Sequence, residues 1–285
     1  MPRSGIAIPA PPEGYEQLFV ETWNKPGLNG AAWYSWSGNP GSSPTTTTWD
    51  PAMLSTGDGL VITAEPDTVT AGKTRTGGLG RTVPIKAPYI IQVACKRPLL
   101  SGLKRNAGIS WPNLGTWPAD VEIDWAEDGG LSAFGLNYHS NDPTYNAVQT
   151  ALTSSQSIPV DTSQWGFFTF VNTGTSVSTT WTPLSGPSVT ISLTPRYNSP
   201  LPHNLDMQIE ALASNLLTNP VQFDFDWYQE LVPVSSSPTP TPPPPVPAPT
   251  NYFGAVYTRN AKGLYVIAGY QDIARPWGAG WHPVG

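Results

Sequence analysis

The sequence predicts an all-β protein whose main domain is a two-sheet sandwich. Charged residues make up only 12% of the chain, which also holds 27 glycines and 33 prolines. Typical domains carry about 25% charged residues. No amphipathic helical pattern of about 12 residues or more is found. Frequent turn formers between short apolar runs are typical of short strands, and such strands pack as a sandwich or barrel.

Runs of alternating or continuous apolar residues mark the strands of this sandwich. They span residues 59–65, 89–97, 131–139, 166–172, 188–193, 205–213 and 222–231. The domain that they form is expected to cover residues 15–232, after an extended N-terminal arm at 1–14. The chain has twelve tryptophans, more than one β core is expected to need, which favours a ligand-stacking role for some of them.

The last predicted strand carries acids and aromatic residues in alternation. Asp224 and Asp226 alternate there with Phe223, Phe225 and Trp227. Successive side chains on a strand point to opposite faces. The aromatic residues are therefore predicted to face the core, and the acids to form a polar outer face.

The most informative segment is 121–128, where Glu122, Asp124 and Glu127 lie in a run of strand-forming character. Residues i and i+2 of a strand share a face, so Glu122 and Asp124 point the same way. One extra residue, a β-bulge, would return Glu127 to that face. Clustered carboxylates serve to bind a cation or to perform acid–base chemistry. A calcium site and a solvated acidic strand are the alternatives to catalysis.

The surroundings of the acids favour carbohydrate chemistry. Retaining glycosidases need two carboxyl groups about 5–5.5 Å apart, one as nucleophile and one as acid/base. Trp111 and Trp117 precede the acids closely, and His139 follows them on a second strand-like stretch after a Gly-rich turn. Aromatic faces stack on the apolar faces of sugar rings, while carboxylates act on the glycosidic oxygen.

This order of residues resembles glycoside hydrolase family 16, the laminarinase-like β-glycanases with a concanavalin-like jelly roll. The resemblance covers roughly residues 15–232. Further segments resemble the opening strand of the family, a second strand near the N-terminus and the closing strand, at 18–23, 59–64 and 223–228. The two residues between Asp124 and Glu127 are similar to the bulged branch of the family.

The resemblance implies a role for each candidate residue. Glu122 would be the nucleophile, Glu127 the general acid/base, and Asp124 the helper that hydrogen-bonds to the nucleophile. The two tryptophans, Trp111 and Trp117, would line subsites near the cleaved bond. His139 would support these residues from the next strand, and a purely structural hydrogen-bonding histidine is the alternative.

Three positions depart from the family pattern. Val121 stands where the family often has glycine, and Gln92 and Ala94 stand where a glutamate and an arginine are usual. These departures leave the acids intact. They are expected to bear on the identity of the substrate and on the rate of catalysis.

Composition excludes several function classes. The net charge is −6 and no basic patch is found, which argues against nucleic-acid binding and favours a neutral, polyhydroxylated substrate. Cys95 is the single cysteine, so no intrachain disulfide is possible, and the histidines show no metal-ligand spacing. No cofactor is expected, although a structural calcium ion remains an alternative. No apolar stretch is long enough to span a membrane.

The C-terminal part of the sequence predicts a spacer and a docking module. Residues 233–250 form a Pro-rich linker of polyproline II type. Residues 251–285 carry many aromatic side chains and a predicted hairpin, with strands at 255–259 and 264–268. So short a module cannot bury a sufficient core alone. It is therefore expected to dock to itself or, if the protein is part of a virion, to other virion proteins.

The function predicted from the sequence is an endo-acting retaining glycoside hydrolase that cleaves a β-linked polysaccharide of a host cell envelope. The alternative is a non-catalytic carbohydrate-binding or structural tail protein with the same jelly roll. Residues 1–14 lack the apolar run of a secretory signal. Together with the spacer and docking module, this favours a virion component, such as a bacteriophage tail protein. Cytoplasmic residence or non-classical release is the alternative location.

Overall fold

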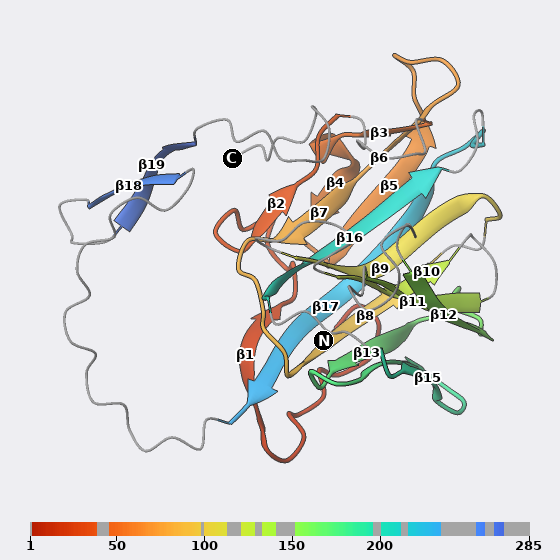
Figure 1. Cartoon of the computed structure of the whole chain (residues 1–285). Helices are drawn as coiled ribbons and strands as arrows, with labels where there is room; N and C mark the ends of the chain where they lie inside the picture. The colour runs from red at the N-terminus through yellow and green to blue at the C-terminus, as the bar shows by residue number, and fades with distance from the viewer. Residues whose placement is uncertain are drawn as a thin grey trace. The chain divides into compact units, whose positions relative to one another are not determined.

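Two sheets packed face to face form the main body of the protein in a computed structural model of the chain (Figure 1). The structure describes residues 2–38, 46–97, 100–112, 121–128, 133–140, 152–195, 201–211, 216–234, 255–259 and 265–270. One short 3-10 turn, η1 (Pro51–Met53), is the only helical element within these ranges. The predicted all-β sandwich is therefore confirmed.

The larger sheet has ten strands, which come from the whole length of the domain. Its order is β15 (Val189–Leu193), β14 (Val177–Pro183), β13 (Gly166–Asn172), β8 (Tyr89–Lys96), β17 (Val221–Pro233), β5 (Leu60–Pro66), β6 (Thr74–Thr76) and β3 (Thr47–Trp49). In addition, β1 (Tyr15–Glu21) pairs with β17 and β4 (Leu54–Thr56) pairs with β5.

The smaller sheet has seven strands and carries the predicted acidic segment. Its order is β12 (Leu152–Pro159), β11 (Ala133–Ser140), β10 (Glu122–Asp128), β9 (Leu103–Pro112), β16 (His203–Ala211), β7 (Gly78–Arg81) and β2 (Trp33–Ser35). Every strand predicted in the domain is present within a few residues of its expected bounds. Short strands such as β2 and β7 were missed because three or four residues show no clear alternation.

The core between the sheets is rich in aromatic side chains. Trp33, Trp125 and Trp181 are almost fully buried in it, and Trp125 stacks on Phe170 with ring centroids 5.6 Å apart. Trp23 also belongs to this core. The expectation that one β core leaves many tryptophans free for ligands is therefore wrong for these residues, because large rings fill the space between two broad sheets.

The last strand of the domain corrects a second expectation. Phe223 and Phe225 belong to the main core, but Trp227 does not. The pairing of β17 with β8 shifts register between Phe225 and Trp227, and this irregularity turns Trp227 to the outer face of the larger sheet. Asp224 is no solvent-facing acid either, since its residue is only 5% exposed.

A buried ionic network lies beside the end of β10. Asp128 binds Arg97 Nη1 at 2.5 Å and Arg105 Nη2 at 2.7 Å, and both arginines are fully buried. Arg97 also donates to the carbonyl of Ala126 at 3.1 Å. A single carboxylate thus joins the segment after β8, strand β9 and strand β10.

A second compact unit begins after Val234. Its described part is an antiparallel hairpin of β18 (Ala255–Arg259) and β19 (Tyr265–Tyr270). These strands match the hairpin predicted from the sequence, whereas the Pro-rich segment at 235–250 lies outside the described residues. The docking role of residues 251–285 remains a prediction. Within the described ranges, no helix has the length and apolar character needed to cross a membrane.

We expect Asp128→Asn to destabilise the domain by about 3–5 kcal/mol, because it leaves two buried guanidinium groups without a counter-charge. Chemical denaturation followed by tryptophan fluorescence measures the loss. The matched control is Glu13→Gln at an exposed acid, where the expected change is within about 0.5 kcal/mol. Equal stabilities for Asp128→Asn and the control would contradict the structural role of the network.

Candidate active site

The acidic strand β10 contains the bulge that the sequence predicted. Asp124 pairs with Asn137 of β11, but Glu127 pairs with Gly135, so three steps on β10 match two on β11. Strand β9 has a matching extra residue relative to β16, because Ile109 pairs with Asp206 and Asn106 with Gln208. The irregularity therefore runs through two neighbouring strands at the same level.

The bulge residues are held from the opposite sheet. Trp125 and Ala126 both lie in the main core. The Trp125 carbonyl accepts a 2.6 Å hydrogen bond from Thr179 Oγ1, and the Ala126 carbonyl accepts one from Arg97. Two successive residues thus point into the core, and Glu127 returns to the face of Asp124.

Strand pairing places the three acids on the outer face of the seven-stranded sheet, the face turned away from the core. Ile123, Trp125 and Ala126 occupy the core side of β10, which leaves the outer side to Glu122, Asp124 and Glu127. These three are the residues that the sequence predicted to share a face.

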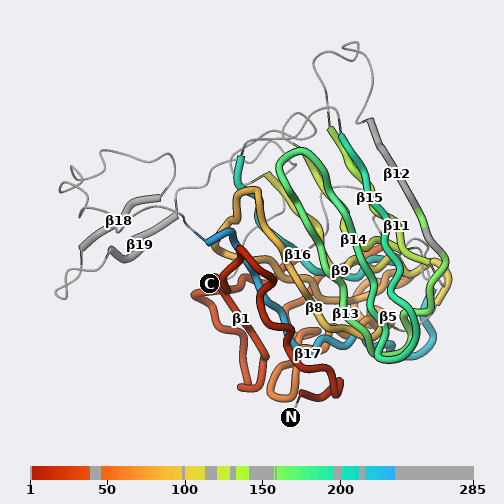
Figure 2. Tube along the Cα trace, turned by 90° about the horizontal axis from the view of Figure 1, so that it is seen from below, coloured from red at the N-terminus to blue at the C-terminus, as the bar shows by residue number. Residues whose placement is uncertain are grey.

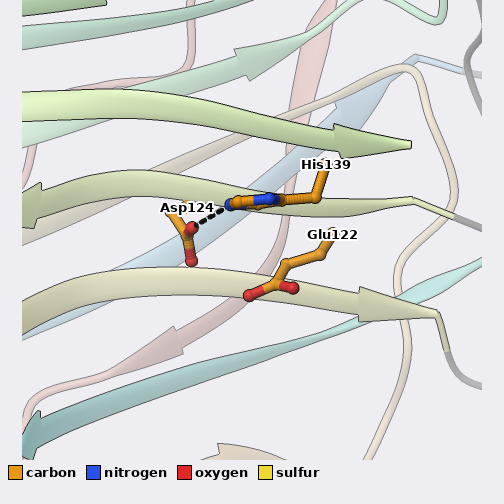
Figure 3. A group of neighbouring side chains, drawn as sticks. All are labelled: Glu122, Asp124 and His139. Carbon is orange, nitrogen blue, oxygen red and sulfur yellow. Dashed lines mark hydrogen bonds and ion pairs between the residues drawn. The ribbon is translucent and has the colours of Figure 1, made fainter. Parts of the chain in front are cut away.

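Asp124 lies at the centre of the group. Its Oδ2 atom lies 3.0 Å from His139 Nε2, and its Oδ1 atom accepts a 3.2 Å hydrogen bond from Asn106 Nδ2. Figure 3 shows His139 and Glu122 directed toward Asp124 from β11 and β10. The Asn106 amide is itself oriented by the backbone N–H of Gly108, which donates to its Oδ1 at 3.1 Å.

Ligand atoms of Glu122, Asp124 and His139 lie within 4.8 Å of one another. Two carboxylates and an imidazole at this spacing are a possible ligand set for a small cation. Two of these atoms, however, already meet each other in the Asp124–His139 contact. We therefore describe the group as a hydrogen-bonded cluster.

Glu127 is held by two donors. Asn137 Nδ2 donates to its Oε2 atom at 2.5 Å, and Lys104 Nζ forms an ion pair with its Oε1 atom. Lys104 Nζ also lies 4.0 Å from Glu210 on β16. Burial raises the pKa of Glu210, Lys104 opposes that change, and the charge of Asp124 adds to it. Lys104 is thus shared between Glu127 of the candidate site and the buried Glu210.

The charges around His139 act in opposite directions. Burial by itself lowers its pKa, but the hydrogen bond with Asp124 and the negative charges of Asp124 and Glu122 outweigh burial. The pKa of His139 is therefore raised above its ordinary value of 6.5. The cluster favours an imidazolium ion at this position.

The backbone is strained directly before the first acid. Val121 has a φ of 70°, a left-handed conformation that a β-branched residue rarely adopts. Its side chain is fully buried in the main core. Such strain costs about 1–3 kcal/mol and persists only where the surroundings enforce it. The conformation explains why glycine suits this position.

The remaining predicted positions are placed as follows. Trp111 is half-buried near the end of β9, two residues beyond Ile109, which pairs with Asp124, so it shares the face of the acids. Trp117 lies outside the described residues. The sequence missed Lys104, on the strand just before β10, and Glu210, on β16 far along the chain. The sequence could have identified Asn137, because it precedes His139 by two residues on one strand and therefore shares its face.

The two departures on β8 lie on the other sheet. Gln92 bonds with Thr169 at 3.0 Å and with Gln229 at 2.6 Å, and Ala94 packs against Ile6 and Trp227. Both therefore face away from the core on the ten-stranded sheet and do not touch the candidate active site. The expectation that they bear on the substrate finds no support in their position.

We expect Asp124→Asn to destabilise the protein more in acid than in base. A histidine whose folded pKa is raised stabilises the fold fully below its unfolded pKa, and loses this contribution as pH rises through the folded pKa. The loss should be about 1–2 kcal/mol at about pH 5.5 and clearly smaller at about pH 9, measured by chemical denaturation.

His139→Asn is the matched control, because it should abolish most of this pH dependence. Ring-proton NMR gives a direct check, with a His139 midpoint above 6.5 in the parent protein and a lower midpoint in Asp124→Asn. Identical losses at both pH values would contradict the ionic pairing.

Comparisons with known proteins show a shared fold without a sequence match. No protein-family model matches the chain, and no curated protein matches its sequence. An endo-β-1,3-glucanase from Pyrococcus furiosus superposes with a TM-score of 0.63 at 15% identity, over 77% of this chain and 95% of that one.

Two further solved structures agree with this comparison. A family 16 endo-glucanase from Bacteroides ovatus superposes with a TM-score of 0.62 at 15% identity, over 75% of this chain and 99% of that one. LamAcat from Zobellia galactanivorans gives 0.61 at 15% identity, over 75% and 96%. The domain therefore has the jelly-roll fold of these proteins, nearly over their full lengths.

Proposed function

We propose that this protein is an endo-acting glycoside hydrolase of the family 16 type that cleaves a β-linked polysaccharide with retention of configuration. The observation that carries the proposal is the placement of Glu122, Asp124 and Glu127 on one sheet face across a bulge. The fold shared with endo-β-glucanases supports it.

In the proposed mechanism, Glu122 attacks the anomeric carbon while Glu127 gives a proton to the departing glycosidic oxygen. The bond between the anomeric carbon and that oxygen breaks, and a glycosyl–Glu122 ester forms. Glu127 then takes a proton from water, which attacks the same carbon and releases Glu122. Asp124, tied to His139 and Asn106, orients the nucleophile beside it.

The ion pair with Lys104 is suited to only one of these two steps. A carboxylate held by Lys104 and Asn137 is ready to accept a proton, as Glu127 must in the second step. To donate in the first step, Glu127 has to lose the contact with Lys104. Glu210, 4.0 Å from the ammonium group, offers a second partner for Lys104 when a substrate arrives.

The charge of the outer face favours an uncharged glycan. Acidic side chains outnumber basic ones among the described residues of this face. The basic ones are Lys104 and His139, and the acidic ones are Glu122, Asp124, Glu127, Asp206 and Glu210. Lys104 is already committed to two of the acids. An anionic polymer would meet like charges here, and such contacts are an effective means of rejecting a substrate.

A non-catalytic carbohydrate-binding protein is the second candidate, and one observation favours it. In the protein without substrate, Lys104 forms an ion pair with Glu127, the proposed general acid. A protein that only binds carbohydrate never has to break this ion pair. The two candidates differ in whether any sugar is liberated.

We expect the parent protein to release reducing sugar from neutral β-glucans or galactans and not from sulfated or uronic polymers. Glu122→Gln should lower the release by roughly 10³-fold or more, because it removes the nucleophile. A reducing-sugar assay over a panel of polysaccharides measures both effects. NMR of the first product should show the β-anomer.

The matched control is Glu16→Gln, at an exposed glutamate on β1 of the other sheet, which should leave the release unchanged. Binding by both the parent and Glu122→Gln without release of sugar would support the binding protein instead. Cleavage of anionic polymers at rates equal to neutral ones would contradict the charge argument and leave the hydrolase standing.

We further propose that the enzyme works as a virion component, such as a tail protein, on polysaccharides of a host envelope. The Pro-rich segment at 235–250 and the hairpin β18–β19 in a separate compact unit support this role. Immunodetection in purified particles tests it, with removal of residues 251–285 expected to abolish incorporation. Recovery of the protein only from host cytoplasm would argue against this location.

A further inference from the structure

The N-terminal arm packs on the outer face of the ten-stranded sheet and has an apolar cluster of its own. Ile6 contacts Ala94 and Trp227 there, and these residues are separate from the main core. No residue of 2–14 belongs to a strand. Figure 2 shows the start of the chain, in red, running beside β17. Side-chain contacts rather than a β-ladder thus hold the arm.

Two buried carboxylates of β17 receive the polar groups of the arm. Asp226 accepts from the backbone N–H of Arg3 at 3.1 Å, from that of Ser4 at 2.7 Å, and from the Ser4 hydroxyl. Asp224 binds Arg3 Nη2 at 2.7 Å. Both aspartates are only 5% exposed. Charge-assisted bonds of this kind are among the strongest in proteins.

The sheet also donates to the main chain of the arm. Trp227 Nε1 donates to the carbonyl of Ile6 at 2.9 Å, and Gln229 Nε2 donates to that of Pro9 at 3.0 Å. Both donors are buried. The face therefore contacts a basic side chain, a hydroxyl, an aliphatic side chain and the backbone in a fixed order.

Without the arm, this face would be costly to maintain. Asp226 would exchange the donors of Arg3 and Ser4 for water. Ala94 and Trp227 would lose their apolar contact with Ile6. The indole N–H of Trp227 would lose its acceptor as well. The face is thus complementary to one particular peptide sequence and poorly suited to bare solvent.

We propose that this face is a peptide-binding site for an Arg-Ser-Gly-Ile segment, occupied by the protein's own residues 2–9 and able to accept the same segment from a separate molecule. The separate cluster around Ile6 lets the arm leave without opening the main core. Pro9, Pro11 and Pro12 restrict the connection to β1 to extended conformations, so the arm is prepared for exchange between molecules.

The test uses a variant that lacks residues 2–9 and a synthetic peptide with the sequence of those residues. The variant should melt at a lower temperature than the parent protein. Peptide at 100 times its Kd should raise the melting temperature of the variant by about 5–10 °C, and a scrambled peptide should not. A folded variant that the peptide neither binds in titration calorimetry nor stabilises would overturn the proposal.

Two substitutions distinguish specific recognition of the peptide from nonspecific binding. Asp226→Asn in the shortened protein should weaken peptide binding by about tenfold or more. Asp224→Arg should weaken binding of the natural peptide and restore it for a peptide with Arg3→Glu. Affinities that ignore both changes would contradict a built site.

Full-length Arg3→Ala serves if the shortened protein does not fold. Its arm is weakened but present, so the natural peptide should compete for the site and raise the melting temperature of Arg3→Ala more than that of the parent. An equal response, or none, would overturn the proposal. None of these measurements depends on the catalytic activity.

Discussion

The bulge shared by β10 and β9 is the constraint on which the candidate site depends. A bulge leaves backbone groups outside the regular ladder, and these groups need partners when they are buried. Thr179 of β14 and Arg97, which follows β8, supply them by donating to the carbonyls of Trp125 and Ala126. Since Asp128 holds Arg97 in turn, the core fixes where Glu127 emerges on the outer face.

The same geometry solves the repulsion among the acids. Asp124 and Glu127 each take partners from neighbouring strands, and these partners lie one level away along the strand. Asn137 pairs in register with Asp124 but donates to Glu127, and Asn106 pairs with Glu127 but donates to Asp124. This crossed arrangement links the two levels of the bulge. It holds the acids in position before any ligand is present, as preorganised catalysis requires.

Local patterns in the sequence predicted the strands and the shared face of the acids, because alternation and spacing are local properties. They did not predict Lys104 or Glu210, whose strands meet through pairings that span about half the domain. They also misplaced Trp227, because nothing in an alternating run reveals an irregularity that appears only when β17 pairs with β8. Local alternation thus identifies a face only as far as the next bulge.

Two acidic pairs in this chain look alike in sequence, Glu122 with Asp124 and Asp224 with Asp226, and the structure separates them by what covers them. The second pair is bound by the N-terminal arm. Asp124 is as buried as the second pair, but Glu122 is partly exposed, and the side chains of His139 and Glu127 keep exposures of 21% and 16%. The partners of Asp124, His139 and Asn106, come from its own sheet. Partial access at Glu122, rather than charge, therefore distinguishes the pair of the candidate active site from the pair that the arm covers.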